Sequence, residues 1–362
     1  MAEDELPPKP EGPLRAGWTT GACAAAAAAA AAQAHATGEF PAEIAIRLPL
    51  GQRPVFALAH RARGADWVEA GVTKDAGDDP DVTHGAMIVT RLRPAPPGSG
   101  LRFEAGEGVG TVTRPGLALP PGEPAINPHP RKLIAESLAA VAAELGGPLD
   151  WVVRVSIPGG AELAKKTLNA RLGIVGGLSV LGTTGIVTPY SCAAWIHSIH
   201  RGIDVARAAG LGHVAASTGS VSESFVKAHY ALPEAALIDM GDFAGGTFKY
   251  LRDHPIPRVT LAGGFAKLAK LAGGAMDLHS ARSRVDNAAL AALMRELGAA
   301  TDLAADAPAG AYLLEARRTG VPLADAVAAR ARAVARATIG PGVALDVLVV
   351  DRSGDCVGRA GP

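Results

Sequence analysis

Residues 213–274 have the sequence HVAASTGSVSESFVKAHYALPEAALIDMGDFAGGTFKYLRDHPIPRVTLAGGFAKLAKLAGG, in which short apolar runs alternate with segments of helical period. The runs at 213–218, 236–240 and 258–262 each lead into small or polar residues. Alternation of this kind is typical of a parallel sheet with helices on both faces, where ligands bind outside the carboxyl ends of the strands. We therefore predict a doubly wound, mostly parallel, Rossmann-like α/β/α domain over residues 176–362.

The first half of the chain has a different pattern. Residues 43–155 contain short apolar runs separated by turns rich in Gly and Pro, and one segment of helical period at 131–147. This pattern predicts an α+β domain over residues 15–175, so the fold class is two-domain, α+β followed by α/β. Residues 1–14, which are acidic and rich in proline, are predicted to be a disordered tail.

Composition limits the classes of partner. The 362 residues include 35 basic and 35 acidic side chains, so there is no overall positive field for nucleic acid or an anionic membrane. The alanine-rich segment at 22–36 is too short and too weakly apolar to span a bilayer. Three widely separated cysteines without metal-ligand spacing favour a reducing, cytoplasmic location and no protein-bound metal. Composition leaves open whether the chain forms a homo-oligomer.

A glycine-rich segment, LGIVGGLSVLGTTGIVTPYS at residues 172–191, is the most unusual part of the sequence. Glycine allows a backbone to turn with positive φ or to approach a ligand closely. The segment has neither a Walker loop nor a clean dinucleotide fingerprint. Two interpretations remain open: a loop that holds a carboxylate or phosphate, and a junction in which glycine is needed for packing alone.

A second segment, KDAGDDPDVTHG at residues 74–85, contains Asp75, Asp78, Asp79 and Asp81. Carboxylates this close repel one another, so a cation, a positively charged ligand or turn hydrogen bonds should compensate them. Calcium is disfavoured because Pro80 interrupts the segment and the spacing is not that of an EF-hand loop. A solvated loop with aspartates capping turns, or a carboxylate acting as a base, remains open.

Basic residues near turns are candidates for binding anions. Lys267 and Lys270 are three apart on a predicted helix and share one face. For each such pair a solvated helix face is the alternative. No GxSxG elbow is present, which disfavours a serine hydrolase.

Five segments, in order, resemble one family. They are GWTTGACAAAA from Gly17, VTKDAGDDPDVTHGA from Val72, GEGVGTVTRPGLALPPGEPAINPHPRKLI from Gly106, AKKTLNARLGIVGGLSVLGTTGIVTPYS from Ala164 and GGFAKLAKLAGGAMDLHS from Gly263. The family is the cobalt-precorrin-5B C1-methyltransferases of cobalamin biosynthesis, and the resemblance covers about residues 15–284. It implies transfer of a methyl group from S-adenosyl-L-methionine to C1 of a cobalt corrinoid, giving cobalt-precorrin-6A. Such a transfer needs alignment of donor and acceptor rather than a covalent enzyme intermediate.

The implied substrate is a polycarboxylate and the implied donor is cationic. We therefore assign residues to roles by the charge of their side chains. The candidates for catalysis are Asp75, Asp78, Asp79 and His84. The candidates for holding the donor are Gly176, Gly177, Gly182, Thr183, Thr184 and Gly185. The candidates for binding the corrinoid are Arg114, Arg131, Lys132, Lys165, Lys166, Arg171, Lys267, Lys270, His279 and Ser280. The alternatives are a nucleotide-dependent oxidoreductase, with HVAASTGS and Asp239 as an approximate fingerprint, and a non-catalytic corrinoid-binding scaffold.

Overall fold

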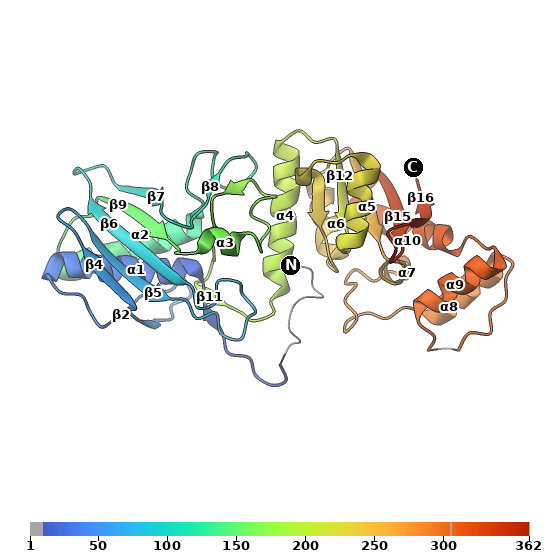
Figure 1. Ribbon diagram of the computed structural model, residues 1–362, viewed down its shortest axis with the longest axis horizontal. Helices are drawn as coiled ribbons and strands as arrows, with labels where there is room; N and C mark the ends of the chain where they lie inside the picture. The colour runs from blue at the N-terminus through green and yellow to red at the C-terminus, as the bar shows by residue number, and fades with distance from the viewer. Residues whose placement is uncertain (1–9, 305, 362) are drawn as a thin grey trace. The chain divides into compact units, whose positions relative to one another are not determined.

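The computed structural model describes residues 10–304 and 306–361, which fall into two compact units (Figure 1). Unit 1 contains the described residues up to Ser191, and unit 2 begins at Cys192. The predicted boundary at 175/176 therefore lies inside unit 1. Of the predicted tail, residues 1–9 lie outside the described residues.

Two short strand pairs explain why the glycine-rich segment belongs to unit 1. Strand β10 (Ile174–Val175) pairs with β8 (Thr111–Val112), and β11 (Ile186–Val187) pairs with β1 (Gly17–Trp18). Both partners lie far earlier in the sequence. The segment is thus fixed at two places to the first half of the chain.

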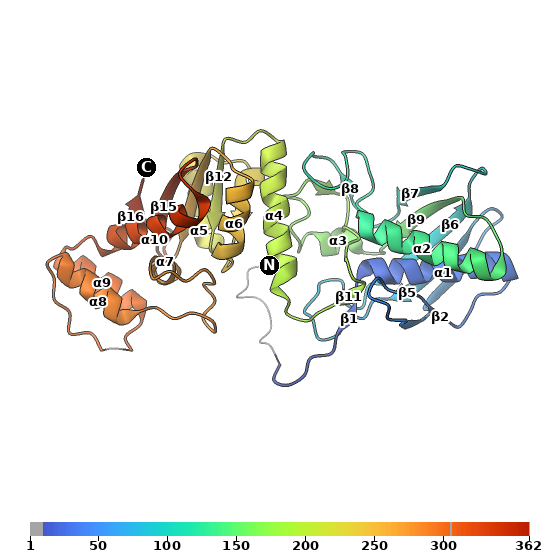
Figure 2. The ribbon, with the colours of Figure 1, turned by 180° about the vertical axis from the view of Figure 1, so that it is seen from behind.

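Among the described residues, unit 1 is built on a five-stranded sheet in the order β4-β5-β6-β9-β7. Its strands are β4 (His60–Arg63), β5 (Val68–Thr73), β6 (Met87–Pro94), β9 (Trp151–Ser156) and β7 (Leu101–Ala105). Neighbours are antiparallel except β7 and β9, which are parallel. Helix α1 (Thr20–Thr37) packs on β5 and β6, and α2 (Pro128–Leu145) lies beside α1 (Figure 2). Unit 1 therefore has the α+β character predicted for this half.

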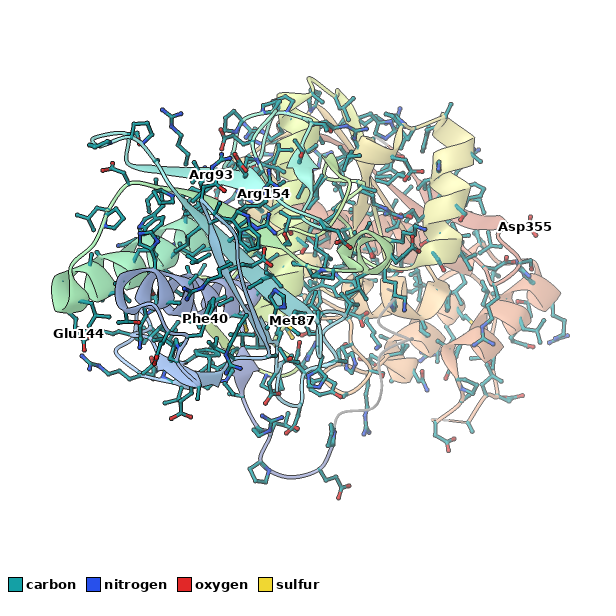
Figure 3. The ribbon with its side chains drawn as sticks, turned by 60° about the vertical axis from the view of Figure 1, so that its left-hand side comes forward. Phe40, Met87, Arg93, Glu144, Arg154 and Asp355 are labelled. Atoms are coloured by element: carbon teal, nitrogen blue, oxygen red, sulfur yellow. The ribbon has the colours of Figure 1, made fainter. Side chains whose placement is uncertain are left out.

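The opposite face of this sheet carries charged side chains (Figure 3). Arg93 and Arg154 project from it, because their neighbours Leu92 and Val153 are fully buried against the helices. Arg154 lies 2.9 Å and Arg93 3.6 Å from the carboxylate of Glu104. The ion pairs keep this face polar.

Helix α1 is rich in alanine and is buried from Thr20 to Ala32, whereas residues 35–37 at its end are exposed. Thr19 caps it by accepting a hydrogen bond from the Ala22 backbone N–H at 3.2 Å, and Gly38 ends it at φ 85°. Residues 22–31 are at most 2% exposed. Because alanine has no bulk beyond Cβ, the sheet and α2 can approach the helix closely.

The remaining elements of unit 1 are small. Strands β2 (Glu43–Ala45) and β3 (Val55–Ala57) form an antiparallel pair, and α3 (Gly160–Ala164) follows β9. Leu48 and Phe56 from this region complete the core around α1.

The described residues of unit 2 form one sheet in the order β13-β12-β14-β15-β16. These strands are β13 (Leu237–Asp239), β12 (His213–Ser217), β14 (Arg258–Gly263), β15 (Ala344–Val350) and β16 (Cys356–Ala360). The first four are parallel and β16 is antiparallel. By chain order the parallel strands are arranged 2-1-3-4, which differs from the 3-2-1-4-5-6 arrangement of the Rossmann fold. The mixed α/β content, with parallel and antiparallel sheets, is confirmed.

The connections of unit 2 leave the sheet in opposite directions. Helix α5 (Ser220–Tyr230) leads from β12 to β13, whereas α6 (Ala244–Asp253) leads back to β14 and α7 (Phe265–Ala272) leads on toward β15. Right-handed crossovers therefore place α5 on one face and α6 and α7 on the other, where α10 (Leu323–Ile339) packs against both.

The other helical elements of unit 2 are α4 (Cys192–Ala208), the 3₁₀ turn η2 (Glu234–Ala236), α8 (Asn287–Glu296) and α9 (Ala309–Thr319). In the part of the chain that the structure describes, no helix has the length and apolar character needed to cross a membrane.

Candidate functional site

Residues 74–85, the aspartate loop, connect β5 to β6, and Arg15 binds two of its carboxylates. The Arg15 guanidinium donates to both oxygens of Asp75, at 2.5 and 2.9 Å. The Arg15 backbone N–H donates to Asp78 at 2.6 Å. The hydrogen bond from Arg15, helped by one from the Gly77 N–H, lowers the pKa of Asp75 to about 2. Asp75 is therefore an ionised, positioned carboxylate rather than a proton acceptor.

A buried lysine compensates a third carboxylate. Lys74 is 2% exposed, and its ammonium contacts Asp81 and the Thr83 hydroxyl. Asp81 also accepts the Thr83 N–H at 2.7 Å. Burial opposes ionisation of Asp81, but Lys74 and Thr83 outweigh it and hold the pKa of Asp81 below its usual value. Within residues 10–304 and 306–361 there is no group of three His, Cys, Asp or Glu able to hold a metal.

Asp79, like Asp78, is held by a backbone group, whereas Asp75 and Asp81 are held by cationic side chains. Asp79 accepts a hydrogen bond from the Tyr190 N–H at 2.8 Å. Burial is the largest influence on it and raises its pKa, with the Tyr190 N–H acting in the opposite direction. A half-buried carboxyl with a raised pKa is suited to proton transfer.

His84 lies at the end of the aspartate loop with half of its side chain exposed. Its Nδ1 accepts a hydrogen bond from the Ala76 N–H at 3.1 Å. In the neutral ring the proton then resides on Nε2, which leaves an N–H donor directed away from the Ala76 contact. The ring can thus donate one hydrogen bond to a ligand.

The start of the chain joins the aspartate loop to the glycine-rich segment. The Trp18 N–H donates to Asp75 O at 2.7 Å, and the Thr19 N–H donates to Gly185 O at 3.0 Å. The Gly21 N–H reaches Leu181 O at 3.3 Å. Asp75, Asp78, Asp79 and His84 therefore lie near Gly182, Thr183, Thr184 and Gly185, on either side of residues 17–21.

Packing explains several of the predicted donor-binding glycines. A Cβ at Gly177 would lie 2.2 Å from Gly108 O, and one at Gly182 would lie 2.5 Å from the Thr19 side chain. Gly176 has φ +88° with open space around it. Thr184 forms hydrogen bonds with the backbone of Ile186. The structure therefore supplies a packing reason for Gly177 and Gly182, and their role toward a donor stays a prediction.

The basic residues predicted in unit 1 lie in different environments. Arg131 is mostly buried, pairs with Glu123 at 2.7 Å and stacks over Phe103. Arg114 packs its side chain on Gly173 and donates to the backbone oxygen of Arg171 at 3.4 Å. Lys132, Lys165 and Lys166 are exposed, with Glu136 and Glu162 beside the first two. The exposed lysines are the ones best placed to reach a ligand.

In unit 2 the predicted residues gather at the loop after β13. The Lys267 ammonium donates to Thr218 O at 2.8 Å and lies 3.1 Å from Asp242. Lys270 is buried and donates to Leu278 O at 2.7 Å, so it does not share an exposed face with Lys267. The Leu278 N–H donates to Asp242 O, which brings the following residues, His279 and Ser280, to this loop. His279 Nδ1 accepts the Ala281 N–H at 3.1 Å, and Ser280 is exposed.

Sequence reasoning missed Arg15, Tyr190, Ser217 and Asp242. Arg15 and Tyr190 are far from the aspartate loop in sequence, so no local pattern indicates their contacts. Ser217 lies near the end of one predicted strand and Asp242 follows another, and their position at strand ends was an available signal.

Two family models match the chain. Residues 8–189 match the family model CbiD, and residues 277–361 match the model described as CbiD, C-terminal domain. The chain belongs to the CbiD family.

CbiD-family relatives match over nearly the whole chain. A Brucella canis protein is 54% identical over 365 residues, covering 98% of this chain and 99% of that protein. A Brucella anthropi protein is 55% identical, covering 96% and 95%. Both are named cobalt-precorrin-5B C(1)-methyltransferase. The 1.9 Å crystal structure of a cobalamin biosynthesis protein (cbiD) from Archaeoglobus fulgidus is 26% identical, with a TM-score of 0.41, covering 75% of this chain and 84% of that chain.

Proposed function

We propose that this chain transfers a methyl group from S-adenosyl-L-methionine to C1 of cobalt-precorrin-5B, giving cobalt-precorrin-6A in cobalamin biosynthesis. The observation that carries the proposal is the name shared by relatives that are 54% and 55% identical over almost the full length of both chains. When bound, the donor supplies a methyl group from its sulfonium, and the C–S electron pair stays on sulfur.

The aspartate loop supplies groups for the acceptor side of the reaction. The substrate carbon provides the electron pair of the new C–C bond, and the transfer adds one positive charge to the macrocycle unless a proton leaves. Asp79, half-buried and with a raised pKa, is the proposed acceptor of that proton. His84, with its Nε2 proton directed away from Ala76, is the proposed hydrogen-bond donor to the macrocycle.

Asp75 and Asp78 have a positioning role in this proposal. Both are held by Arg15, whose guanidinium and backbone N–H bind them at 2.5 to 2.9 Å. They fix the shape of the loop that carries Asp79 and His84. Alignment of the reacting groups is the main contribution an enzyme makes to such a transfer.

The carboxylates of the corrinoid require cationic partners. In unit 1 the exposed Lys132, Lys165 and Lys166 are the proposed contacts, with Arg114 and Arg171 in support. Arg131 is left out because Glu123 and Phe103 already engage it.

The experiment that tests this function is mass spectrometry of the corrinoid after incubation with methyl-labelled S-adenosyl-L-methionine. We expect one labelled methyl group, at C1. Unmodified corrinoid recovered in a stable complex with the protein would instead favour a binding scaffold, and a methyl group at another carbon would refute the assignment of C1.

A further inference from the structure

The carboxyl edge of the unit 2 sheet is formed by the turns that follow β12, β13 and β14. The chain leaves β12 toward β13 on one side and leaves β14 toward β15 on the other. Neighbouring parallel strands whose connections diverge leave a crevice at their carboxyl ends, and ligands of open α/β sheets bind there. The edge between β12 and β14 is such a place.

Two helices begin at this edge on glycine. Gly219 precedes the 11-residue α5 and Gly264 precedes the 8-residue α7, and no side chain of the described residues caps either helix. A Cβ built at Gly219 or Gly264 meets no atom within 4 Å. The two turns are in contact, since the Thr218 N–H donates to Ala262 O at 2.9 Å. The helix starts therefore have space beside them for a group that accepts hydrogen bonds.

Two buried polar atoms at the same edge lack hydrogen-bond partners among the described residues. They are Ser217 Oγ, at the end of β12, and Asp242 Oδ1, in the turn after β13. Ser217 is 1% exposed and Asp242 is 4% exposed. Asp242 Oδ1 does form an ion pair with the Lys267 ammonium at 3.1 Å, and the same ammonium donates to Thr218 O. Buried polar atoms are nearly always bonded, so the Ser217 hydroxyl, which has no partner among the described residues, points to a ligand, and the Asp242 carboxylate lies beside it.

An aromatic ring flanks the edge. Trp195 of α4 donates through Nε1 to Asp239 O at 3.3 Å, at the end of β13. Its indole lies 3.5 Å from a Cβ built at Gly241 and is partly exposed. A flat, partly exposed ring next to hydrogen-bonding groups is suited to a nucleobase.

We propose that this carboxyl edge binds the methyl donor, through both its nucleoside and its amino-acid end. The donor carboxylate matches the helix starts at Gly219 and Gly264, and its ammonium and ribose hydroxyls match Asp242 and Ser217. The identity of the ligand rests on the proposed function, whereas the site rests on the contacts above. This location is an alternative to the glycine-rich segment of unit 1.

Valine substitutions test the site without straining the backbone. Gly219 has φ 169° and Gly264 has φ −67°, and both are conformations that valine adopts. G219V and G264V place a branched side chain in the open space. G212V is the matched control, because a Cβ at Gly212 also meets open space but Gly212 precedes β12, at the opposite end of the sheet. T184A tests the rival location.

The probe is S-adenosylhomocysteine, titrated calorimetrically into the full chain without corrinoid. We expect G219V and G264V to weaken binding by about tenfold or more, with G212V and T184A unchanged. Unchanged affinity in both valine variants, loss of affinity in T184A alone, or no measurable affinity in the wild type would overturn the proposal. If a valine variant does not fold, D242N and S217A replace it, with weaker binding expected of each.

The labelled-methyl assay separates this proposal from the proposed function. A wild-type chain that binds S-adenosylhomocysteine at this edge but methylates no corrinoid contradicts the function and leaves the site standing. A chain that methylates C1 while G219V and G264V bind normally contradicts the site and leaves the function standing.

Discussion

The backbone N–H of Tyr190 donates to the carboxylate of Asp79 at 2.8 Å, across 111 residues of sequence. The backbone of Tyr190 has φ 55°, in the left-handed region that residues other than glycine rarely adopt. The contact joins the end of unit 1 to the aspartate loop. Among the described residues Asp79 forms no ion pair, whereas Asp75 pairs with Arg15 and Asp81 pairs with Lys74.

The variant D79N tests the chemical role of this carboxyl. The amide oxygen can still accept the Tyr190 N–H, so we expect an unchanged melting temperature but a kcat lowered by about 100-fold or more. Wild-type activity should fall as the pH drops through the raised pKa of Asp79, because the base is then protonated. The variant should lack that limb of the pH profile. D78N, at the adjacent position, should reduce kcat by less, and a kcat within about threefold of wild type in D79N would contradict the role.

The Arg15–Asp75 pair predicts a pH-dependent effect on stability. The pKa of Asp75 is about 2 in the folded state, which is below its value in the unfolded chain. The pair therefore contributes its full stabilisation above a pH of about 4, and this contribution decreases as the pH falls toward 2. Because the side chains of Arg15 and Asp75 are 58% and 44% exposed, we expect R15A to lower the melting temperature by no more than about 2 °C at pH 7. Calorimetric scans between pH 7 and pH 2.5 should show this difference shrinking. A difference that grows on acidification would refute the assignment.

Substitution of Lys74 should lower the free energy of unfolding more than substitution of Arg15, because Lys74 is buried. K74M removes the partner of Asp81, and breaking a buried ion pair costs about 3 kcal/mol. Urea unfolding should show this loss. The double variant K74M/D81N should recover part of it, since the uncompensated charge is gone. Equal stabilities of the single and double variants would show that the pair is not coupled.

The glycine-rich segment predicts unequal effects at adjacent positions. In G177A the new Cβ meets the Gly108 carbonyl oxygen, so the backbone must move at a cost of about 3 kcal/mol. In G176A the space is open and only the left-handed conformation is penalised, by about 1 kcal/mol. Denaturant titration of both variants measures the order. A reversed order would remove the packing explanation.

The exposed lysines predict an effect on the corrinoid alone. K165A and K166A should each raise the KM for cobalt-precorrin-5B about threefold at low salt and leave kcat unchanged. The effect should diminish at high salt because exposed charges are screened. K249A, an exposed lysine of unit 2, serves as the control. Equal KM values for all three variants would exclude Lys165 and Lys166 as substrate contacts.

The sequence was sufficient to predict the mixed α/β content of both halves. The strand–helix alternation at 213–274 corresponds to β12, α5, β13, α6, β14 and α7. The strand order and the antiparallel β16 were not predictable, because pairing between strands depends on residues far apart. The boundary was misplaced for the same reason, since β10 and β11 pair with β8 and β1.

The site was only partly predictable. The cluster of aspartates indicated that compensation was needed, and Lys74, seven residues before Asp81, was visible as a local cation. Arg15, 60 residues from Asp75, was not, because only the fold brings it there. Arg131 and Lys270 carry the charge that an anion requires, but tertiary contacts with Glu123 and Leu278 O already use it.

Between Ala24 and Ala32 helix α1 consists of alanine alone, so over this stretch the shapes of its side chains contain no information about its rotation around its own axis. That angle is set near its first turn, where Gly21 lies against Pro130 and the Thr90 hydroxyl donates to Ala24 O at 2.9 Å. Gly21 and Thr90 together fix the rotation of the helix. A rotation of the helix would also move residues 17–21, which lie between the aspartate loop and the glycine-rich segment. The orientation of α1 and the spacing of these two loops are therefore linked.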